Sequence, residues 1–166
     1  MMSFVLGRFG RRPVSIEPLG AQDSGEIQRI HALAFHHGWS SDDFRSLIAQ
    51  ETVFGFVARP EGKPGKACGF VLARLVAGEA EILTIAVSDE VRKQGVGRSL
   101  MDAVLRYLYQ ERADTLFLEV DENNVAALAL YRRMGFNKVG DRPAYYETSS
   151  GRSSAFILRR DLARPQ

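Results

Sequence analysis

A short run of glycines and basic residues is the first place in the chain where chemistry is expected. The run is Arg92-Lys93-Gln94-Gly95-Val96-Gly97-Arg98, and it follows the apolar segment Thr84-Ile85-Ala86-Val87. It lies where a strand ends and a helix begins, and the free N–H groups of a helix N-terminus bind anions. Glycine allows a ligand to approach the backbone closely. The pattern favours a pyrophosphate site, and a plain strand-to-helix turn is the alternative.

Two common phosphate-binding motifs do not fit this run. The Walker pattern needs a Lys followed by Ser or Thr after its second glycine, whereas Gly97 is followed by Arg98. The dinucleotide fingerprint needs a third glycine three residues after the second, and Leu100 occupies that position. The run therefore indicates a phosphate site of another kind.

A carboxylate and a tyrosine that could move protons come in the next strand and helix. Glu119 lies near the end of the apolar segment 116–120, so we expect it to be partly desolvated, which suits a general base. Asn124 stands where a helix N-cap is expected. Tyr131 follows Asn124 by seven residues, so both lie on one helix face. The alternatives are a solvated acid, a cap without other function and a core aromatic.

The elements that must position these residues follow from hydrophobic periodicity. Strands are expected over 14–19, 52–59, 67–76, 79–87 and 116–120, with the last ones within 136–159. Helices are expected from 21, from 40 or 41, from 95 and from 124; Ile27, Ile30, Leu33 and Ala34 form the apolar stripe of the first. The segment 81–120 predicts one parallel strand pair. We expect an α/β fold with a mixed central sheet of about seven strands and helices on both faces.

Composition narrows the class of protein. The chain has 166 residues, 45% of them hydrophobic, with 22 Lys+Arg against 20 Asp+Glu. These values predict one folded domain over 14–166 after a flexible, Arg-rich tail over 1–13, with an organellar presequence as the alternative for the tail. The balanced charge disfavours a nucleic-acid partner, and no apolar run is long enough for a membrane span. We expect a cytoplasmic protein without a metal site.

Taken in order, these motifs resemble the GCN5-related N-acetyltransferase (GNAT) superfamily. The Arg-x-x-Gly-x-Gly at 92–97 is similar to its acetyl-CoA pyrophosphate motif. The Asn-led helix, Ala-Leu-Tyr at 129–131 and Gly-Phe at 135–136 are similar to the segments that follow in that superfamily. The resemblance implies the GNAT fold, acetyl-CoA as co-substrate and an amine as the acetyl acceptor.

A closer resemblance is to the ribosomal-protein-alanine N-acetyltransferases, and it rests on the run Leu-Glu-Val-Asp-Glu-Asn-Asn-Val-Ala-Ala-Leu-Ala-Leu-Tyr at 118–131. It implies a protein N-terminus as acceptor, with ribosomal protein S18 as one candidate. Glu119 would be the general base and Tyr131 the general acid. Trp39, Tyr145 and Tyr146 would bind the acceptor. The resemblance assigns acetyl-CoA binding to a larger set: Ile85, Ala86, Val87, Lys93, Gln94, Gly95, Val96, Gly97, Arg98 and Asn124.

One departure from that family concerns charge. Glu119, Asp121 and Glu122 form an acidic group where a family member has a basic residue, which bears on the peptide that is accepted. We interpret the group as the place where a cationic amine arrives.

The acceptor class follows from the cost of deprotonation. An α-amino group has a pKa of roughly 8 and a lysine roughly 10.4, so a single carboxylate suits an α-amine better. An acetyltransferase for lysine side chains or small amines is the alternative. A CoA-binding module without turnover is a third hypothesis, but it would need neither Glu119 nor Tyr131. Cys68, the single cysteine, is expected to be an inert buried thiol rather than a nucleophile.

Overall fold

The computed structural model describes residues 13–35, 37–63, 65–148 and 151–162, although the side chains of 144–148 are excluded. The predicted tail over 1–13 thus lies outside the described residues except for Pro13. The elements follow the predicted order, with two short 3-10 helices added. They are β1 (Val14–Pro18), η1 (Ala21–Asp23), α2 (Ser24–Ala34), α3 (Ser41–Ile48), β2 (Val53–Pro60), β3 (Gly69–Val76), β4 (Glu79–Val87), η2 (Asp89–Val91), α4 (Val96–Gln110), β5 (Thr115–Asp121), α5 (Val125–Arg133), β6 (Asn137–Thr148) and β7 (Gly151–Asp161).

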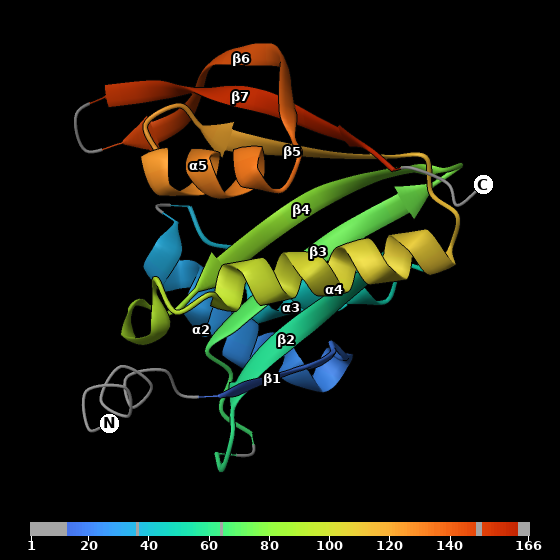
Figure 1. Cartoon of the computed structure of the whole chain (residues 1–166). Coiled ribbons are helices and arrows are strands. Elements are labelled where there is room, and N and C mark those ends of the chain that lie inside the picture. Colours follow the sequence, from blue (N-terminus) through green and yellow to red (C-terminus); the bar gives the residue numbers. More distant parts are fainter. Residues whose placement is uncertain (1–12, 36, 64, 149–150, 163–166) are drawn as a thin grey trace, which may run out of the picture.

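The described strands form one seven-stranded sheet with the order β1-β2-β3-β4-β5-β7-β6. Every neighbouring pair is antiparallel except β4 and β5, which are parallel. The predicted mixed sheet of about seven strands is therefore confirmed. The parallel pair is where the two halves of the sheet meet (Figure 1).

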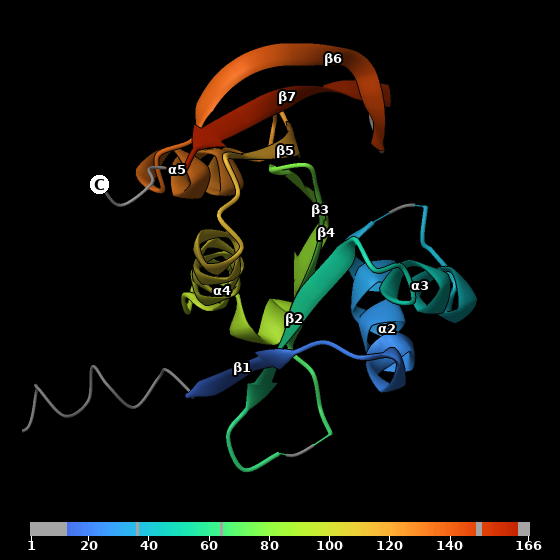
Figure 2. The same ribbon diagram turned by 90° about the vertical axis from the view of Figure 1, so that its right-hand side faces the viewer.

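Helices cover both faces of the sheet, as predicted. Helices α4 and α5 lie on one face, and α2 and α3 lie on the other, against the half made by β1 to β4 (Figure 2). Each face has its own apolar core. Leu100, Met101 and Leu116 are fully buried in the core under α4, and Ile27, Phe44 and Phe70 in the core under α2 and α3.

Local sequence explains where the helices around the site begin. Ser40 starts α3 with a capping box, because its hydroxyl accepts a hydrogen bond from Asp43 N (3.1 Å) while the Asp43 carboxylate accepts one from Ser40 N (2.8 Å). Gly95 precedes α4 in the left-handed conformation (φ 83°), which glycine adopts without strain. Asn124 caps α5 through a hydrogen bond that Oδ1 accepts from Ala127 N (3.2 Å).

One expectation about these elements was wrong. Leu33 is 78% exposed instead of lying in the buried stripe of α2. It is six residues beyond Ile27, hence roughly 120° round the helix from it, and His31 takes the buried position. The strand expected around Tyr145 and Tyr146 is confirmed, as part of β6, where Tyr146 pairs with Ser153 of β7.

Candidate active site

The site is built where β4 and β5 separate. Their pairing covers Glu79 to Glu81 opposite Thr115 to Phe117 and does not extend to the later residues of either strand. The two strands then border an open cavity of about 1780 Å³, which is also lined by residues of α2, α4 and α5. We call the part bordered by α4 and α5 the α4 side, and the part bordered by α2 and the following loop the α2 side. The cavity thus connects the two faces of the sheet.

The glycine-rich run forms the α4 side of the cavity. Lys93, Gly95, Val96, Gly97 and Arg98 all line it. The first backbone hydrogen bond of α4 runs from Ser99 N to Gly95 O (3.0 Å). The N–H groups of the residues before Ser99 belong to the first turn of the helix, where they have no acceptor within the helix. These N–H groups and the positive end of the helix dipole make the turn suitable for phosphate oxygens.

The end of β4 presents its backbone to the same cavity. Ser88 N donates a hydrogen bond to Cys68 O (2.8 Å), on the β3 side of the strand. Since successive peptide groups of a strand alternate in direction, those of Val87 and Ile85 point to the β5 side, beyond the residues that pair with β5. Ile85, Ala86 and Val87 line the cavity. An extended polar chain could therefore hydrogen-bond along this segment as a strand would.

Glu119 lies on β5 at the opening, and its carboxylate is held by an arginine. Its side chain is 28% exposed, and Oε2 accepts a hydrogen bond from Arg142 Nη1 of β6 (3.3 Å). Leu118 and Val120 are buried in the core under α4, so the alternation of the strand directs Glu119 to the opposite, α2 side. Glu119 and Arg142 both line the cavity. The expected partial desolvation is present, whereas the ion pair was not predicted.

Tyr131 lies on α5, where it reaches the cavity from the α4 side. It is 6% exposed, and its ring packs edge-on against Phe136 (centroids 5.7 Å apart). Burial raises the pKa of Tyr131 to about 12, so the phenol stays protonated at neutral pH. Tyr131 is thus both a buried core aromatic and a residue that reaches the cavity, which are the two roles that the sequence left open.

The other members of the acidic group have local partners. Asp121 accepts hydrogen bonds from Ser153 Oγ (2.8 Å) and Asn123 N (2.8 Å). Glu122 accepts one from Ser154 N (3.1 Å). These contacts tie the end of β5 to β7. Asp121 lines the cavity together with Glu119, whereas Glu122 does not, and the interpretation of three acids awaiting a cationic amine stays a prediction.

An aromatic cluster makes the α2 side. The His31 ring lies 5.1 Å from the Trp39 ring in a stacked arrangement and 4.5 Å from Phe35, and all three residues line the cavity. His31 is 3% exposed, and burial lowers the pKa of its imidazole. Trp39 also packs against Phe44 of α3 (5.4 Å), which fixes this wall.

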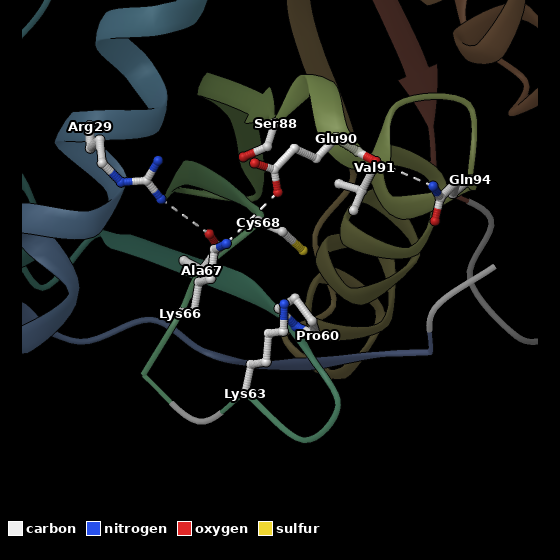
Figure 3. A pocket seen from close by; sticks show the side chains of 10 residues that line it. All are labelled: Arg29, Pro60, Lys63, Lys66, Ala67, Cys68, Ser88, Glu90, Val91 and Gln94. Atoms are coloured by element: carbon white, nitrogen blue, oxygen red, sulfur yellow. Dashed lines mark hydrogen bonds and ion pairs between the residues drawn. The ribbon is translucent and has the colours of Figure 1, made fainter. Parts of the chain in front are cut away.

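Three of the predicted site residues have no described side chain that lines this cavity. Tyr145 and Tyr146 lie in β6, but their side chains are outside the described residues. Gln94 lines a second, smaller cavity of about 360 Å³ near Lys63, Lys66 and Arg29 (Figure 3). Lys93 has a positive φ of 60°, and the chain turns sharply there between Arg92 and Gly95.

The smaller cavity also holds the only cysteine. Cys68 is 4% exposed there, and burial raises the pKa of its thiol. A raised pKa leaves little reactive thiolate at neutral pH. This agrees with the expectation of an inert thiol.

Residues that sequence reasoning missed are His31, Thr84 and Arg142, which line the cavity from α2, β4 and β6. Their contacts with the site join positions far apart in the chain, and no local motif marks them. Two features are absent from the described residues. No group of three His, Cys, Asp or Glu there could hold a metal ion. No helix there is long and apolar enough to cross a membrane.

Comparison with known proteins matches the chain to acetyltransferases. Residues 25–136 match the model of the acetyltransferase (GNAT) family. The chain is 39% identical over 131 residues to the ribosomal protein bS18-alanine N-acetyltransferase of Escherichia coli, covering 79% of this chain and 83% of that protein. It is 39% identical over 156 residues to the N-alpha-acetyltransferase RimI of Mycobacterium tuberculosis, covering 92% of this chain and 96% of that protein.

Solved structures give the same result for the fold. The crystal structure of the ribosomal-protein-S18-alanine N-acetyltransferase from Escherichia coli superposes with a TM-score of 0.84 at 31% identity, over 93% of this chain and 97% of that one. NAA60 of Arabidopsis thaliana, solved with a bisubstrate analogue, superposes with a TM-score of 0.81 at 21% identity, over 92% and 100% of the two chains. The similarity to NAA60 supports the fold alone.

Proposed function

The chain belongs to the acetyltransferase (GNAT) family, and from this premise we propose that it acetylates the α-amino group of a protein N-terminus. The single observation that carries the proposal is that one cavity joins the α4 N-terminus, Glu119 and Tyr131. The relatives named for N-terminal acetylation are 39% identical to the chain, and one of them acts on ribosomal protein bS18. We propose the same N-terminus as a candidate acceptor. A cytoplasmic location stays a prediction.

Acetyl-CoA is the co-substrate, and it supplies an acetyl group activated as a thioester. The α4 side suits its pyrophosphate through Lys93, Gly95, Val96, Gly97 and Arg98. The β5-facing peptide groups of Ile85 and Val87, with Ala86 between them, suit the amide-bearing arm. Asn124 lines the cavity near the start of α5, where its Oδ1 serves as the helix cap. Gln94 would contribute through its backbone, since its side chain lies at the smaller cavity.

Glu119 is the proposed general base. An incoming ammonium must lose a proton before its nitrogen can attack, and a carboxylate accepts it directly or through one water. The Arg142 guanidinium holds the Glu119 carboxylate on the α2 side, from which the amine would arrive. Deprotonating a lysine would cost about 3 kcal/mol more than an α-amine at the same pH, which favours the N-terminal acceptor.

Tyr131 is the proposed general acid. At neutral pH its phenol is protonated, because burial raises its pKa to about 12. A phenol with so high a pKa stabilises a departing thiolate by donating a hydrogen bond before it yields the proton. The base on the α2 side and the acid on the α4 side thus act on opposite ends of the reacting group.

Acceptor recognition is assigned to the α2 side. Trp39 stacks on His31 and borders the cavity. We propose that Trp39 contacts the first residues of the acceptor, together with Tyr145 and Tyr146. The cavity is open rather than enclosed, which suits a peptide better than a small amine.

The test is a panel of acceptors incubated with acetyl-CoA. It includes the N-terminal peptide of ribosomal protein S18, the same peptide with a blocked α-amine and an internal lysine, and polyamines. We expect acetylation of the free α-amine only. Labelling of the blocked lysine peptide or of polyamines alone would contradict the proposal and favour the small-amine or lysine alternative.

A further inference from the structure

A buried hydroxyl without a partner lies in the wall of the large cavity. Thr84 of β4 is 7% exposed and lines the cavity, and its Oγ1 has no hydrogen-bond partner among the described residues. A hydroxyl buried in this way destabilises a fold unless something else satisfies it. The position of Thr84 beside an open cavity indicates that a bound molecule does so.

The irregular pairing of β4 decides where this hydroxyl lies. Leu72 of β3 pairs with Thr84 and Ala73 pairs with Ile82, so Leu83 is an extra residue in β4. A bulge of this kind redirects the side chains that follow it. Ala86 lies in the core under α2, and Thr84, two residues before it, faces the same side of the sheet.

Glu119 faces that same side from the neighbouring strand. Thr84 is three residues beyond the last paired residue of β4, and Glu119 is two beyond the last paired residue of β5. The two side chains therefore project to the α2 side from opposite borders of the opening. A group that enters between them from the α2 side meets a carboxylate on one border and a hydroxyl on the other.

We propose that Thr84 Oγ1 is an acceptor-binding group, which takes a hydrogen bond from the incoming amine. This inference rests on the proposed function and deepens it. Glu119 removes one proton from the ammonium, and Thr84 holds a remaining N–H so that the nitrogen lone pair faces the thioester carbon. The C–N bond then forms and the C–S bond breaks. The thiolate receives its proton from Tyr131, and the new amide nitrogen gives its surplus proton to solvent, from which Tyr131 is reprotonated.

Thr84→Val removes the hydroxyl and keeps the shape of the side chain. We expect kcat/KM for the N-terminal peptide to fall about tenfold or more, with the KM for acetyl-CoA unchanged. The melting temperature should stay the same or rise, since an unsatisfied buried hydroxyl is removed. Thr84→Ser, which restores the hydroxyl, should recover activity to within about threefold of the unmodified protein, and Thr84→Ala should behave as Thr84→Val does.

Thr115→Val is the matched control. Thr115 Oγ1 is also buried without a partner among the described residues, but Thr115 pairs with Glu79 at the closed end of the β4–β5 pair and lines neither cavity. It should change stability as Thr84→Val does and leave activity unchanged.

Full activity of Thr84→Val in a protein that acetylates N-terminal peptides would overturn the inference and leave the proposed function intact. Loss of activity in Thr84→Ser equal to that in Thr84→Val would also overturn it. An unmodified protein inactive on every N-terminal peptide would refute both the function and the inference.

Discussion

The two sides of the cavity are made of different parts of the polypeptide. The phosphate-binding part of the α4 side lies within residues 85–98 and presents N–H groups of one helix turn and peptide groups at the end of β4. Tyr131 adds a side chain to that side from α5. The α2 side is made of side chains from α2, β4, β5 and β6, including His31, Thr84, Glu119 and Arg142. The segment 85–98 therefore depends on chain conformation, whereas Tyr131 and the α2 side depend on the chemical identity of individual residues.

The comparison predicts a separation of kinetic effects. Changes on the α2 side should alter turnover or acceptor use while acetyl-CoA binding persists. Changes within the segment 85–98 should alter acetyl-CoA binding through backbone geometry, whereas changes at Tyr131, the proposed acid, should alter turnover. A variant that shows the kinetic effect expected for the other side would contradict this separation.

Glu119→Gln should have the largest effect. We expect kcat to fall about 10²–10⁴-fold, because a positioned general base contributes that much. The affinity for acetyl-CoA, measured by calorimetry, should stay unchanged. Glu81→Gln is the control, since Glu81 also lines the cavity and pairs with an arginine, Arg74, at 3.3 Å. Equal losses in both variants would contradict the assignment of the base.

Tyr131→Phe should have the next largest effect. A hydrogen bond to a charged group is worth about 1.5–3 kcal/mol, so kcat should fall roughly ten- to hundredfold while acetyl-CoA still binds. The Phe ring keeps the packing against Phe136, so the melting temperature should hold. Tyr107→Phe, in a ring stacked on Phe54 (4.1 Å), controls for loss of a phenol elsewhere. An unimpaired Tyr131→Phe would remove the proposed acid from the mechanism.

Gly95→Ala tests the α4 side. The positive φ of Gly95 should cost an alanine about 1–2 kcal/mol, although its Cβ would meet no atom within 4 Å. We expect a lower free energy of unfolding and a raised KM for acetyl-CoA, with the acceptor KM unchanged. Gly25→Ala, at an exposed helical glycine with equally free space, should not destabilise the protein. A raised acceptor KM in Gly95→Ala would mean that the two sides are not separate.

His31→Phe tests the α2 side through pH, with the smallest effect. Burial lowers the pKa of His31, so the unfolded chain binds the proton more readily and the free energy of unfolding falls as pH drops below about 6.5. The loss from this residue between pH 6.5 and 5.5 is at most about 1.4 kcal/mol. His31→Phe should reduce it, as urea midpoints at pH 7.5 and 5.5 would show. An unchanged slope in His31→Phe would contradict this.

The difference between local backbone features and side chains from distant elements also explains what could be predicted from the sequence. The order of helices and strands, the parallel pair and the strand-to-helix turn at 92–98 follow from local periodicity and neighbouring residues, and the structure confirms the fold. The ion pair between Glu119 and Arg142 joins residues 23 positions apart, and the contact of His31 with Phe70 joins residues on different elements. Such contacts depend on how strands are ordered and shifted, which local patterns do not reveal.

The bulge at Leu83 is a feature that the alternating sequence pattern does not predict. One extra residue in β4 reverses the alternation of side chains, so a strict two-residue period would assign Leu83 and Thr84 to opposite faces. Tertiary packing places Leu83 beside the core under α2, on the same side as Ala86. The alternating pattern alone could not show that Thr84 and Glu119 project to the same side of the sheet.

The separation of β4 from β5 makes the middle strand of the sheet an edge along part of its length. Exposed edges usually invite pairing with the strand of another chain and hence aggregation. Here the edge lies within a cavity bordered by α4, α5 and β5, where a broad sheet from a second molecule cannot reach it. A single extended molecule can enter the cavity and reach this edge. The fold thus keeps an unpaired strand available to small partners while hiding it from the neighbours that would make it a liability.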